Sequence, residues 1–119
     1  MIVCIRTVRV PGEVRERFLA WINDGRAVRQ AHGILAEWVL EPSRGDGDTV
    51  VVTLWPSHEV FDTWIATPER DRLTASAVHR AVDYRPIVRH DLAGGYLNLP
   101  GLFALPDQYP PASTKENQP

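Results

Sequence analysis

The pattern of apolar and polar positions predicts a strand and then a helix in the first third of the chain. Residues 2–10, IVCIRTVRV, are rich in β-branched residues and end at Pro11-Gly12, which is typical of a strand followed by a turn. Within residues 12–33, apolar positions recur mostly at intervals of three or four, and charged residues fill the opposite positions. This spacing predicts an amphipathic helix that ends at Gly33. The apolar positions are Val14, Phe18, Trp21, Ile22, Gly25 and Val28.

The next apolar runs predict a β-hairpin and a second, interrupted helix. Residues 34–41 (ILAEWVLE) and 49–56 (TVVVTLWP) are joined by seven residues rich in Gly, Asp and Ser, as in a hairpin loop. Ser57 is a favourable N-cap for a helix. Thr67-Pro68 indicates that this helix stops and restarts, because threonine caps a helix and proline suits its first position.

The order of elements predicts an α+β fold. Residues 84–92, YRPIVRHDL, form a last strand, and Pro86 indicates that part of it is a sheet edge. The order β-α-β-β-α-β is ferredoxin-like, an antiparallel sheet with two helices on one face. No predicted helix covers the other, apolar face, so we expect a second copy of the chain there. We expect residues 1–96 to form the domain and residues 97–119, rich in Pro but also in Leu, to be an arm packed on the body or the partner subunit.

Length and charge limit the class of protein. With 119 residues the chain is long enough for one domain, and 44% hydrophobic with 24% charged residues is typical of a globular protein. The net charge of −2 gives no reason to expect nucleic acid or an anionic membrane as a partner. No apolar run has the length of a membrane span and the N-terminus lacks a signal-peptide pattern, so we expect a cytoplasmic protein.

No motif indicates metal or nucleotide chemistry. The chain has one cysteine, Cys4, which excludes an internal disulfide and a cysteine-based zinc site. Cys4 lies in an apolar run and is expected to be a buried thiol. The histidines lack a second His or Cys at the short spacings of zinc sites. No glycine-rich loop joins a strand to a helix, as nucleotide binding would need. We therefore expect no metal and no bound cofactor. The histidines are His32, His58, His79 and His90.

Tryptophans supply the candidate binding surface. Trp55 ends a predicted strand before a proline and is expected to be structural. Trp64 precedes the interruption of the second helix, where packing is broken, and is therefore predicted to be a pocket wall. Trp21 faces inward from the first helix and is either core or pocket.

Arginines on the strands supply the candidate charge. Period-two alternation places Arg6 on the same face of the first strand as Cys4 and Val8, and places Arg89 and His90 on opposite faces of the last strand. An arginine facing the helices would put a fixed cation beside the tryptophan wall. The alternative for each arginine is an outward position or an ion pair with a glutamate of the hairpin.

Two stretches carry a family resemblance. LWPSHEVFDTW (54–64) and IATPERDRL (65–73), in a short β-α-β-β-α-β chain, resemble the antibiotic biosynthesis monooxygenase family of the dimeric α/β-barrel superfamily. The resemblance covers roughly residues 1–96. It implies a homodimer whose sheets pack face to face, with one pocket per subunit between helices and sheet. Some members oxidise polycyclic phenols to quinones with O₂ and no metal or flavin, and others degrade haem.

The chain departs from both branches of that family. The haem-degrading branch uses a tryptophan on the second helix, a histidine about ten residues later and an asparagine on the first strand. Trp64 matches the tryptophan, but position 74 is threonine and the first strand has no asparagine. The quinone-forming branch uses an amide and a tyrosine on the second helix, and this helix has neither.

The sequence therefore predicts a cofactor-independent monooxygenase that acts on an aromatic or polyketide-type phenol. In this hypothesis Arg6 or Arg89 holds the phenolate and His90 is the base. The alternatives are a non-catalytic small-molecule binding or sensing module of the same fold, and a cyclase or isomerase that acts on similar substrates. The predicted substrate-binding residues are Trp64, Trp21, Phe61 and Leu73.

Overall fold

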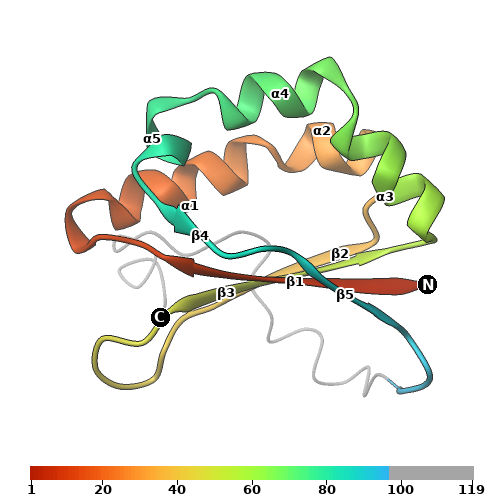
Figure 1. Cartoon of the computed structure of the whole chain (residues 1–119), viewed down its shortest axis with the longest axis horizontal. Coiled ribbons are helices and arrows are strands. Elements are labelled where there is room, and N and C mark those ends of the chain that lie inside the picture. The colour runs from red at the N-terminus through yellow and green to blue at the C-terminus, as the bar shows by residue number, and fades with distance from the viewer. Residues whose placement is uncertain (97–119) are drawn as a thin grey trace, which may run out of the picture.

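The computed structural model describes residues 1–96, which form one antiparallel sheet covered by helices on one face (Figure 1). The predicted arm at 97–119 lies outside the described residues. The strands are β1 (Ile2–Arg9), β2 (Ala36–Leu40), β3 (Thr49–Trp55), β4 (Asp83–Tyr84) and β5 (Val88–Asp91). The helices are the 3₁₀ turn η1 (Gly12–Val14), α1 (Arg15–Asp24), α2 (Arg26–Ala31), α3 (His58–Ile65), α4 (Pro68–Thr74) and α5 (Ala77–Arg80).

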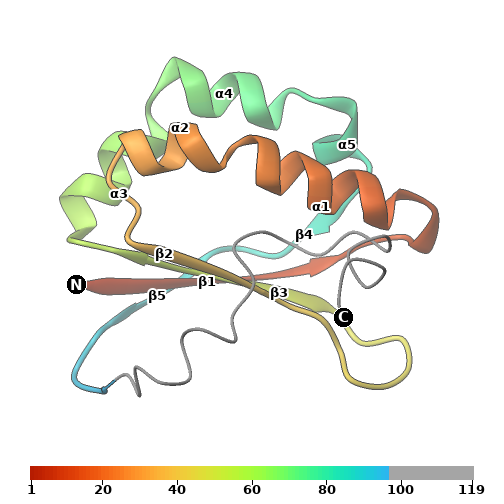
Figure 2. The same cartoon turned by 180° about the vertical axis from the view of Figure 1, so that it is seen from behind.

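The sheet has the predicted ferredoxin-like topology. Its strand order is β2-β3-β1-β4. The strands β4 and β5 both pair with β1, β4 with its residues 8–9 and β5 with its residues 2–5. Every pairing is antiparallel. Viewed from either side, the helices form a single layer above the sheet, and no described element covers its other face (Figures 1 and 2). The α+β fold with helices on one face is therefore confirmed.

The first predicted helix is divided by Gly25. The segment expected to be one helix over 12–33 is a 3₁₀ turn followed by α1 and α2, with Gly25 as the C-cap of α1. Gly25 is buried, and a Cβ there would lie 3.2 Å from the Leu73 Cδ1 atom. The division thus falls where α4 approaches the first helical segment closely.

The second predicted helix is interrupted at the expected place. The Ser57 hydroxyl caps α3 by accepting from the Val60 amide at 3.2 Å, and the Thr67 hydroxyl caps α4 by accepting from the Arg70 amide at 3.2 Å. A further break before α5, capped by the Ser76 hydroxyl, was not predicted. Each cap satisfies an amide that has no partner within its own helix.

The last predicted strand, 84–92, is two short strands separated at 85–87. Proline has no amide hydrogen, so Pro86 cannot donate to β1. The Arg85 amide still donates to the Thr7 carbonyl at 3.0 Å, and pairing resumes where Val88 lies opposite Ile5. The gap therefore falls beside Arg6 of β1.

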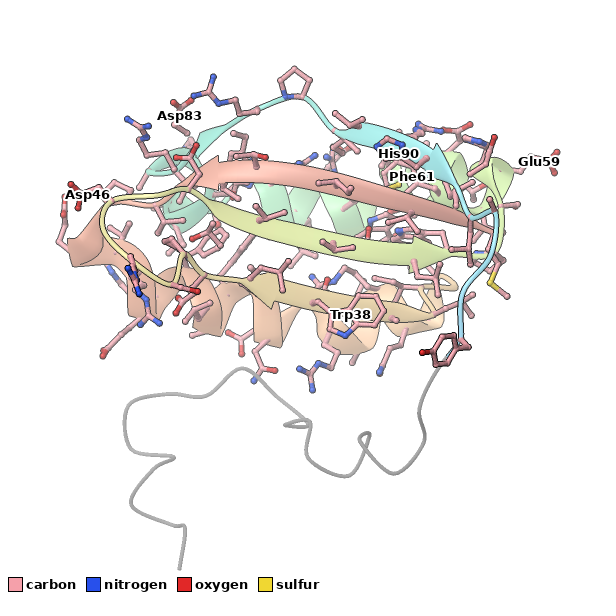
Figure 3. The ribbon with its side chains drawn as sticks, turned by 90° about the horizontal axis from the view of Figure 1, so that it is seen from below. Trp38, Asp46, Glu59, Phe61, Asp83 and His90 are labelled. Carbon is pink, nitrogen blue, oxygen red and sulfur yellow. The ribbon has the colours of Figure 1, made fainter. Side chains whose placement is uncertain are left out.

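The sheet register separates two faces. On β1 the side chains of Ile2, Cys4 and Val8 point towards the helices and are almost fully buried. The opposite face carries apolar residues that remain exposed, including Trp38 and Leu40 at 40% and 51%, and Trp38 is visible there in Figure 3. The expectation of an uncovered apolar face is thus met within the described residues.

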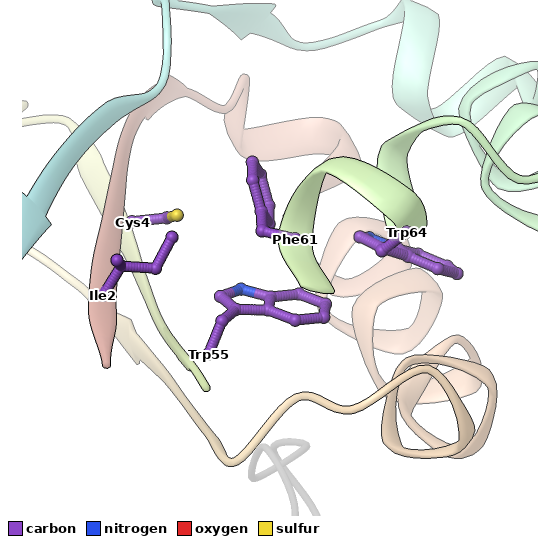
Figure 4. Packing of buried hydrophobic residues seen from close by; sticks show 5 residues of the cluster. All are labelled: Ile2, Cys4, Trp55, Phe61 and Trp64. Atoms are coloured by element: carbon purple, nitrogen blue, oxygen red, sulfur yellow. The ribbon is translucent and has the colours of Figure 1, made fainter. Parts of the chain in front are cut away.

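The core consists of two clusters with Arg6 between them along β1. The first lies under α3, where Trp55, Phe61 and Trp64 pack against β1 (Figure 4). The second lies under α1 and contains Val8 and Phe18. Between the buried residues Cys4 and Val8, β1 presents a charged side chain to the helix layer, and the core is interrupted there. The remaining buried members are Ile2 and Cys4 of the first cluster, and Val14, Ile22 and Val82 of the second.

Candidate functional site

A cavity of about 120 Å³ lies between the helix layer and the sheet, where the two core clusters meet. Its walls are mainly aromatic and aliphatic, which suits a planar apolar ligand. The apolar and aromatic lining residues are Cys4, Phe18, Trp21, Ile22, Val51, Trp55, Phe61, Trp64, Ile65, Leu73, Tyr84 and Ile87.

The tryptophans of the wall are held in different ways. The Trp55 indole N–H donates to the Thr53 hydroxyl at 2.9 Å, and its ring packs edge-on against Phe61 at 5.2 Å between centroids. The Trp64 ring stacks on Trp55 at 6.4 Å. The Trp21 N–H donates to the Leu73 carbonyl at 3.0 Å, which ties α1 to α4. Trp55 and Trp64 are therefore both core and wall, and the predicted division between them does not hold.

The polar part of the cavity is dominated by arginine. Arg29 forms a two-point ion pair with Glu37, with its Nε and one terminal nitrogen each 2.9 Å from a carboxylate oxygen. Both side chains are nearly buried, at 12% and 11% exposed, so the pair is a fixed neutral unit. Arg6 and Arg70 also line the cavity, and no carboxylate of residues 1–96 lies within ion-pair distance of either guanidinium.

Arg6 lies against an aromatic column, which is formed by the stacked rings of Tyr84 and His79. Its guanidinium carbon is 5.2 Å from the centroid of the Tyr84 ring, and the His79 ring stacks on Tyr84 with 4.3 Å between the ring centroids. The Arg6 Nε, His79 Nδ1 and Tyr84 hydroxyl are buried and have no hydrogen-bond partner among the described residues. Buried polar atoms are usually paired, so these three are candidates to bind a ligand.

Burial sets the charge states in this column. Burial raises the pKa of Tyr84 to about 12, so its hydroxyl is protonated and a hydrogen-bond donor at neutral pH. Burial, followed by the positive charges of Arg6 and Arg70, lowers the pKa of His79, which is therefore neutral. Burial, with Arg70 next, lowers the pKa of Arg6, which nevertheless stays charged because arginine ordinarily titrates far above pH 7.

The cavity adjoins an open groove of about 450 Å³ at the gap between β4 and β5. The groove and the cavity share five lining residues, which mark the mouth between them. The shared residues are Arg6, Arg70, Thr74, Tyr84 and Ile87, and the groove adds His79, Arg85 and Pro86. The strand break at Pro86 thus leaves a route from solvent to the aromatic cavity.

The structure brings five of the seven predicted site residues to the cavity. The predicted substrate-binding residues all line it, together with Arg6. They are Trp64, Trp21, Phe61 and Leu73.

Two predicted catalytic residues lie elsewhere. Arg89 faces the helices but pairs with Asp62 at 2.7 Å, and its guanidinium carbon lies 4.7 Å from the centroid of the Phe61 ring, outside the cavity lining. His90 is exposed and, one residue further along β5, points to the opposite face (Figure 3). The structure therefore does not place His90 where it can serve as a base for this cavity.

Three residues near the mouth were missed in the sequence. Arg70 follows a helix start and reads as an ordinary exposed helix residue, and Tyr84 begins a strand whose inward face was not assigned. His79 was considered only as a metal ligand, for which its spacing is unsuitable, and no sequence signal placed it at the site. Among residues 1–96 no three His, Cys, Asp or Glu side chains gather as a metal site, and no helix there is long and apolar enough to cross a membrane.

Comparison with known proteins identifies the family. Residues 1–75 match the model of the antibiotic biosynthesis monooxygenase family. The chain belongs to that family. A haem oxygenase (mycobilin-producing) from Mycobacterium tuberculosis is 33% identical to the chain in an 84-residue alignment that covers 67% of this chain and 74% of the relative.

Solved structures of the family share the fold. The cofactor-independent oxygenase SnoaB from Streptomyces nogalater superposes with a TM-score of 0.67 at 17% identity, over 79% of this chain and 94% of SnoaB. The haem-degrading protein MhuD from Mycobacterium tuberculosis, solved with two haems in its active site, gives 0.64 at 22% identity over 81% and 99%. At these identities the two likenesses show the fold alone.

The lowered pKa of His79 predicts an acid-sensitive contribution to stability. Below pH 6.5, its ordinary pKa, the unfolded chain binds a proton that the folded protein does not, so the free energy of unfolding falls as the pH falls. Urea unfolding at pH 7 and pH 5 should show a larger loss for the wild type than for His79→Gln. Equal losses in the two proteins would mean that His79 is not neutral in the folded state.

Proposed function

We propose that this chain is an oxygenase that oxidises an aromatic phenol with O₂ and needs no bound cofactor. The supporting observation is an aromatic cavity whose mouth holds two arginines, Arg6 and Arg70, that pair with no carboxylate of residues 1–96. Such a site binds a planar ring by its faces and favours the anionic form of a ring hydroxyl. A phenolate is electron-rich and reacts with O₂ directly.

The oxidation then requires the protein only to bind the phenol and to stabilise the negative charge of its phenolate. The phenol loses its proton, the phenolate gives one electron to O₂, and the resulting substrate radical and superoxide combine at a ring carbon. Loss of water leaves a quinone, so one phenol and one O₂ give one quinone and one water. Arg6 stabilises the phenolate, and the protonated Tyr84 hydroxyl donates a hydrogen bond to it.

The proton leaves through the groove. Among the described residues no carboxylate lines the mouth to accept it, and Glu37 within the cavity is already paired with Arg29. The neutral imidazole of His79 lines the groove and accepts or relays the proton, the role that the sequence had suggested for His90. Because its lowered pKa makes the His79 imidazole a weak base, proton transfer requires Arg6 to lower the pKa of the bound phenol.

The proposal is tested by incubating the purified, metal-free and flavin-free protein with an anthrone-type phenol. We expect O₂ consumption and quinone formation in equal amounts, well above autoxidation in buffer. Product that still forms after O₂ is removed would instead indicate a cyclase or isomerase. Tight binding with no product in either atmosphere would indicate a binding or sensing module.

Haem degradation is the second candidate, favoured by the 33% identity to the mycobacterial haem oxygenase. Trp64 lines the cavity, as the haem-degrading branch would require. However, the described lining contains no histidine to ligate iron and no asparagine, and Arg6, Leu73 and Thr74 face the cavity from the corresponding elements β1 and α4. A haem titration followed by absorbance tests this candidate, and a one-to-one complex that yields an open tetrapyrrole with O₂ and a reductant would establish it.

We also propose that the open face of the sheet joins two copies of the chain, in the cytoplasm. The exposed apolar side chains of Trp38, Leu40 and Val88, at 40%, 51% and 52%, lie on that face of β2 and β5.

Light scattering should give about twice 13.4 kDa at micromolar concentration. Trp38→Glu should give the monomer mass, because it buries a charge in the interface, whereas Arg44→Glu in the hairpin loop should leave the dimer intact. A wild-type monomer at that concentration would contradict this arrangement.

A further inference from the structure

Arg70 occupies a distinctive position at the mouth of the cavity. It lies in the first turn of α4, where its amide donates to the Thr67 hydroxyl and its half-buried side chain lines both the cavity and the groove. The interruption between α3 and α4 thus does two things: it ends α3 just after Trp64 and turns Arg70 towards the site. A ligand ring against the tryptophans would have its edge near this guanidinium.

The arginines around the site differ in their partners. Arg29 is neutralised by Glu37 and Arg89 by Asp62, at 2.9 and 2.7 Å. The positive charges of Arg6 and Arg70 instead repel each other, and this repulsion contributes to lowering the pKa of Arg6. Two like charges in a partly buried site without a counterion are unfavourable, and a bound anion removes that repulsion.

The acidic neighbours of Arg70 in sequence do not supply that counterion. The Glu69 carboxylate lies 3.7 Å from His32 and 3.8 Å from Arg72 and forms no ion pair with Arg70. The Asp71 side chain is exposed and has no ion pair among those found in residues 1–96. Since Arg6 alone is enough for one phenolate oxygen, the second guanidinium points to a second negative group on the ligand.

We infer that the substrate is a hydroxyaryl carboxylic acid, whose carboxylate binds Arg70 while its ring hydroxyl binds Arg6 and its ring lies in the tryptophan-lined cavity. This inference rests on the proposed function and specifies its substrate class. A planar guanidinium can bind two oxygens of either a carboxylate or a phosphate, so the backbone around Arg70 decides in favour of a carboxylate. Phosphate sites use several backbone amides, and the Arg70 amide is already bonded to Thr67.

Binding of matched probes tests the inference without any turnover. A hydroxynaphthoate and its methyl ester share the ring and the hydroxyl and differ in one charge. Calorimetric titration of the full-length protein under nitrogen at pH 7 should show the acid bound about tenfold more tightly than the ester, equivalent to ~1.4 kcal/mol. Arg70→Gln should abolish this preference by weakening the binding of the acid while leaving the binding of the ester unchanged. Arg72→Gln is the matched control, because Arg72 lies on the same helix, is 70% exposed and does not line the cavity.

The outcomes separate this inference from the proposed function. If acid and ester bind equally to the wild type, or if Arg70→Gln keeps the preference, the carboxylate site is wrong while the aromatic cavity stands. If neither probe binds, the aromatic site itself is wrong, and the proposed function falls with the inference. Retained preference in Arg72→Gln, together with its loss in Arg70→Gln, supports the assignment.

Discussion

Replacing Trp55 by alanine is expected to lower the free energy of unfolding by about 3–5 kcal/mol, the usual cost of removing a large buried aromatic side chain. Trp55 is 1% exposed and packs against Phe61 and Trp64, while Ile2 lies opposite it on β1. Its removal would join a new void to the existing cavity. Because a domain is stable by only about 5–15 kcal/mol, this is a large fraction of the total. Urea unfolding followed by circular dichroism measures it.

Two further variants calibrate the loss. Trp55→Phe keeps most of the ring volume and should cost clearly less than the alanine variant. Leu35→Ala removes a side chain that is 51% exposed and should change stability by less than about 1 kcal/mol. If Trp55→Ala costs no more than Leu35→Ala, the first core cluster is not the one described here.

Replacing Arg6 by glutamine is expected to reduce phenol oxidation by about a hundredfold, the scale for removing one group that stabilises a developing anion. The fold should survive, because the change removes a charge that has no carboxylate partner in residues 1–96 and is repelled by Arg70. The rate of quinone formation should therefore fall, whereas the thermal midpoint of unfolding should not. Both are measured on the same preparation.

Arg9→Gln is the matched control on the same strand. The Arg9 side chain is 65% exposed and pairs with Asp48 at 3.2 Å, away from the cavity, so its loss should change neither readout appreciably. Arg6→Gln with full activity would remove Arg6 from the mechanism. Arg6→Gln that fails to fold would mean that Arg6 is a structural residue.

The fold was predictable because its signals are local. Ser57 and Thr67 cap helices through contacts within three residues. Period-two alternation placed Arg6 on the same face of β1 as Cys4 and Val8, which the structure shows to be the inner face. The division at Gly25 was missed because the glycine fitted the apolar spacing of one continuous helix; the structure shows that α4 packs closely there, a contact between distant residues. Tertiary packing of this kind leaves no periodic trace in the sequence.

The site was predictable only in part, for the same reason. Alternation put Arg89 and His90 on opposite faces of the last strand but did not determine which of them faces the helices. The pairing of Arg89 with Asp62 depends on how α3 lies over β5. His90 was selected for its chemistry, although the same alternation placed it opposite Arg89. Tyr84 and Arg70 acquire their roles at the mouth only because the β4–β5 gap and the start of α4 meet there.

The ionisation of a bound phenol shows whether the cavity stabilises a phenolate. Two effects compete in this cavity: burial favours the neutral phenol, as it does for Tyr84, whose pKa is raised to about 12, and a hydrogen bond from Arg6 favours the phenolate. For Tyr84 burial wins, because the guanidinium lies over its ring and the hydroxyl has no partner among the described residues. A ligand oxygen bonded to Arg6 should show the reverse.

The measurement is an absorbance titration of a naphthol under nitrogen, free and saturated with protein, since naphthol and naphtholate absorb at different wavelengths. We expect the pKa of the bound naphthol to lie at least about one unit below that of free naphthol, equivalent to ~1.4 kcal/mol in favour of the anion. Arg6→Gln should remove this shift. A bound naphthol with an unchanged or raised pKa would contradict the account, because the cavity would then protect the phenol from the oxidation proposed for it.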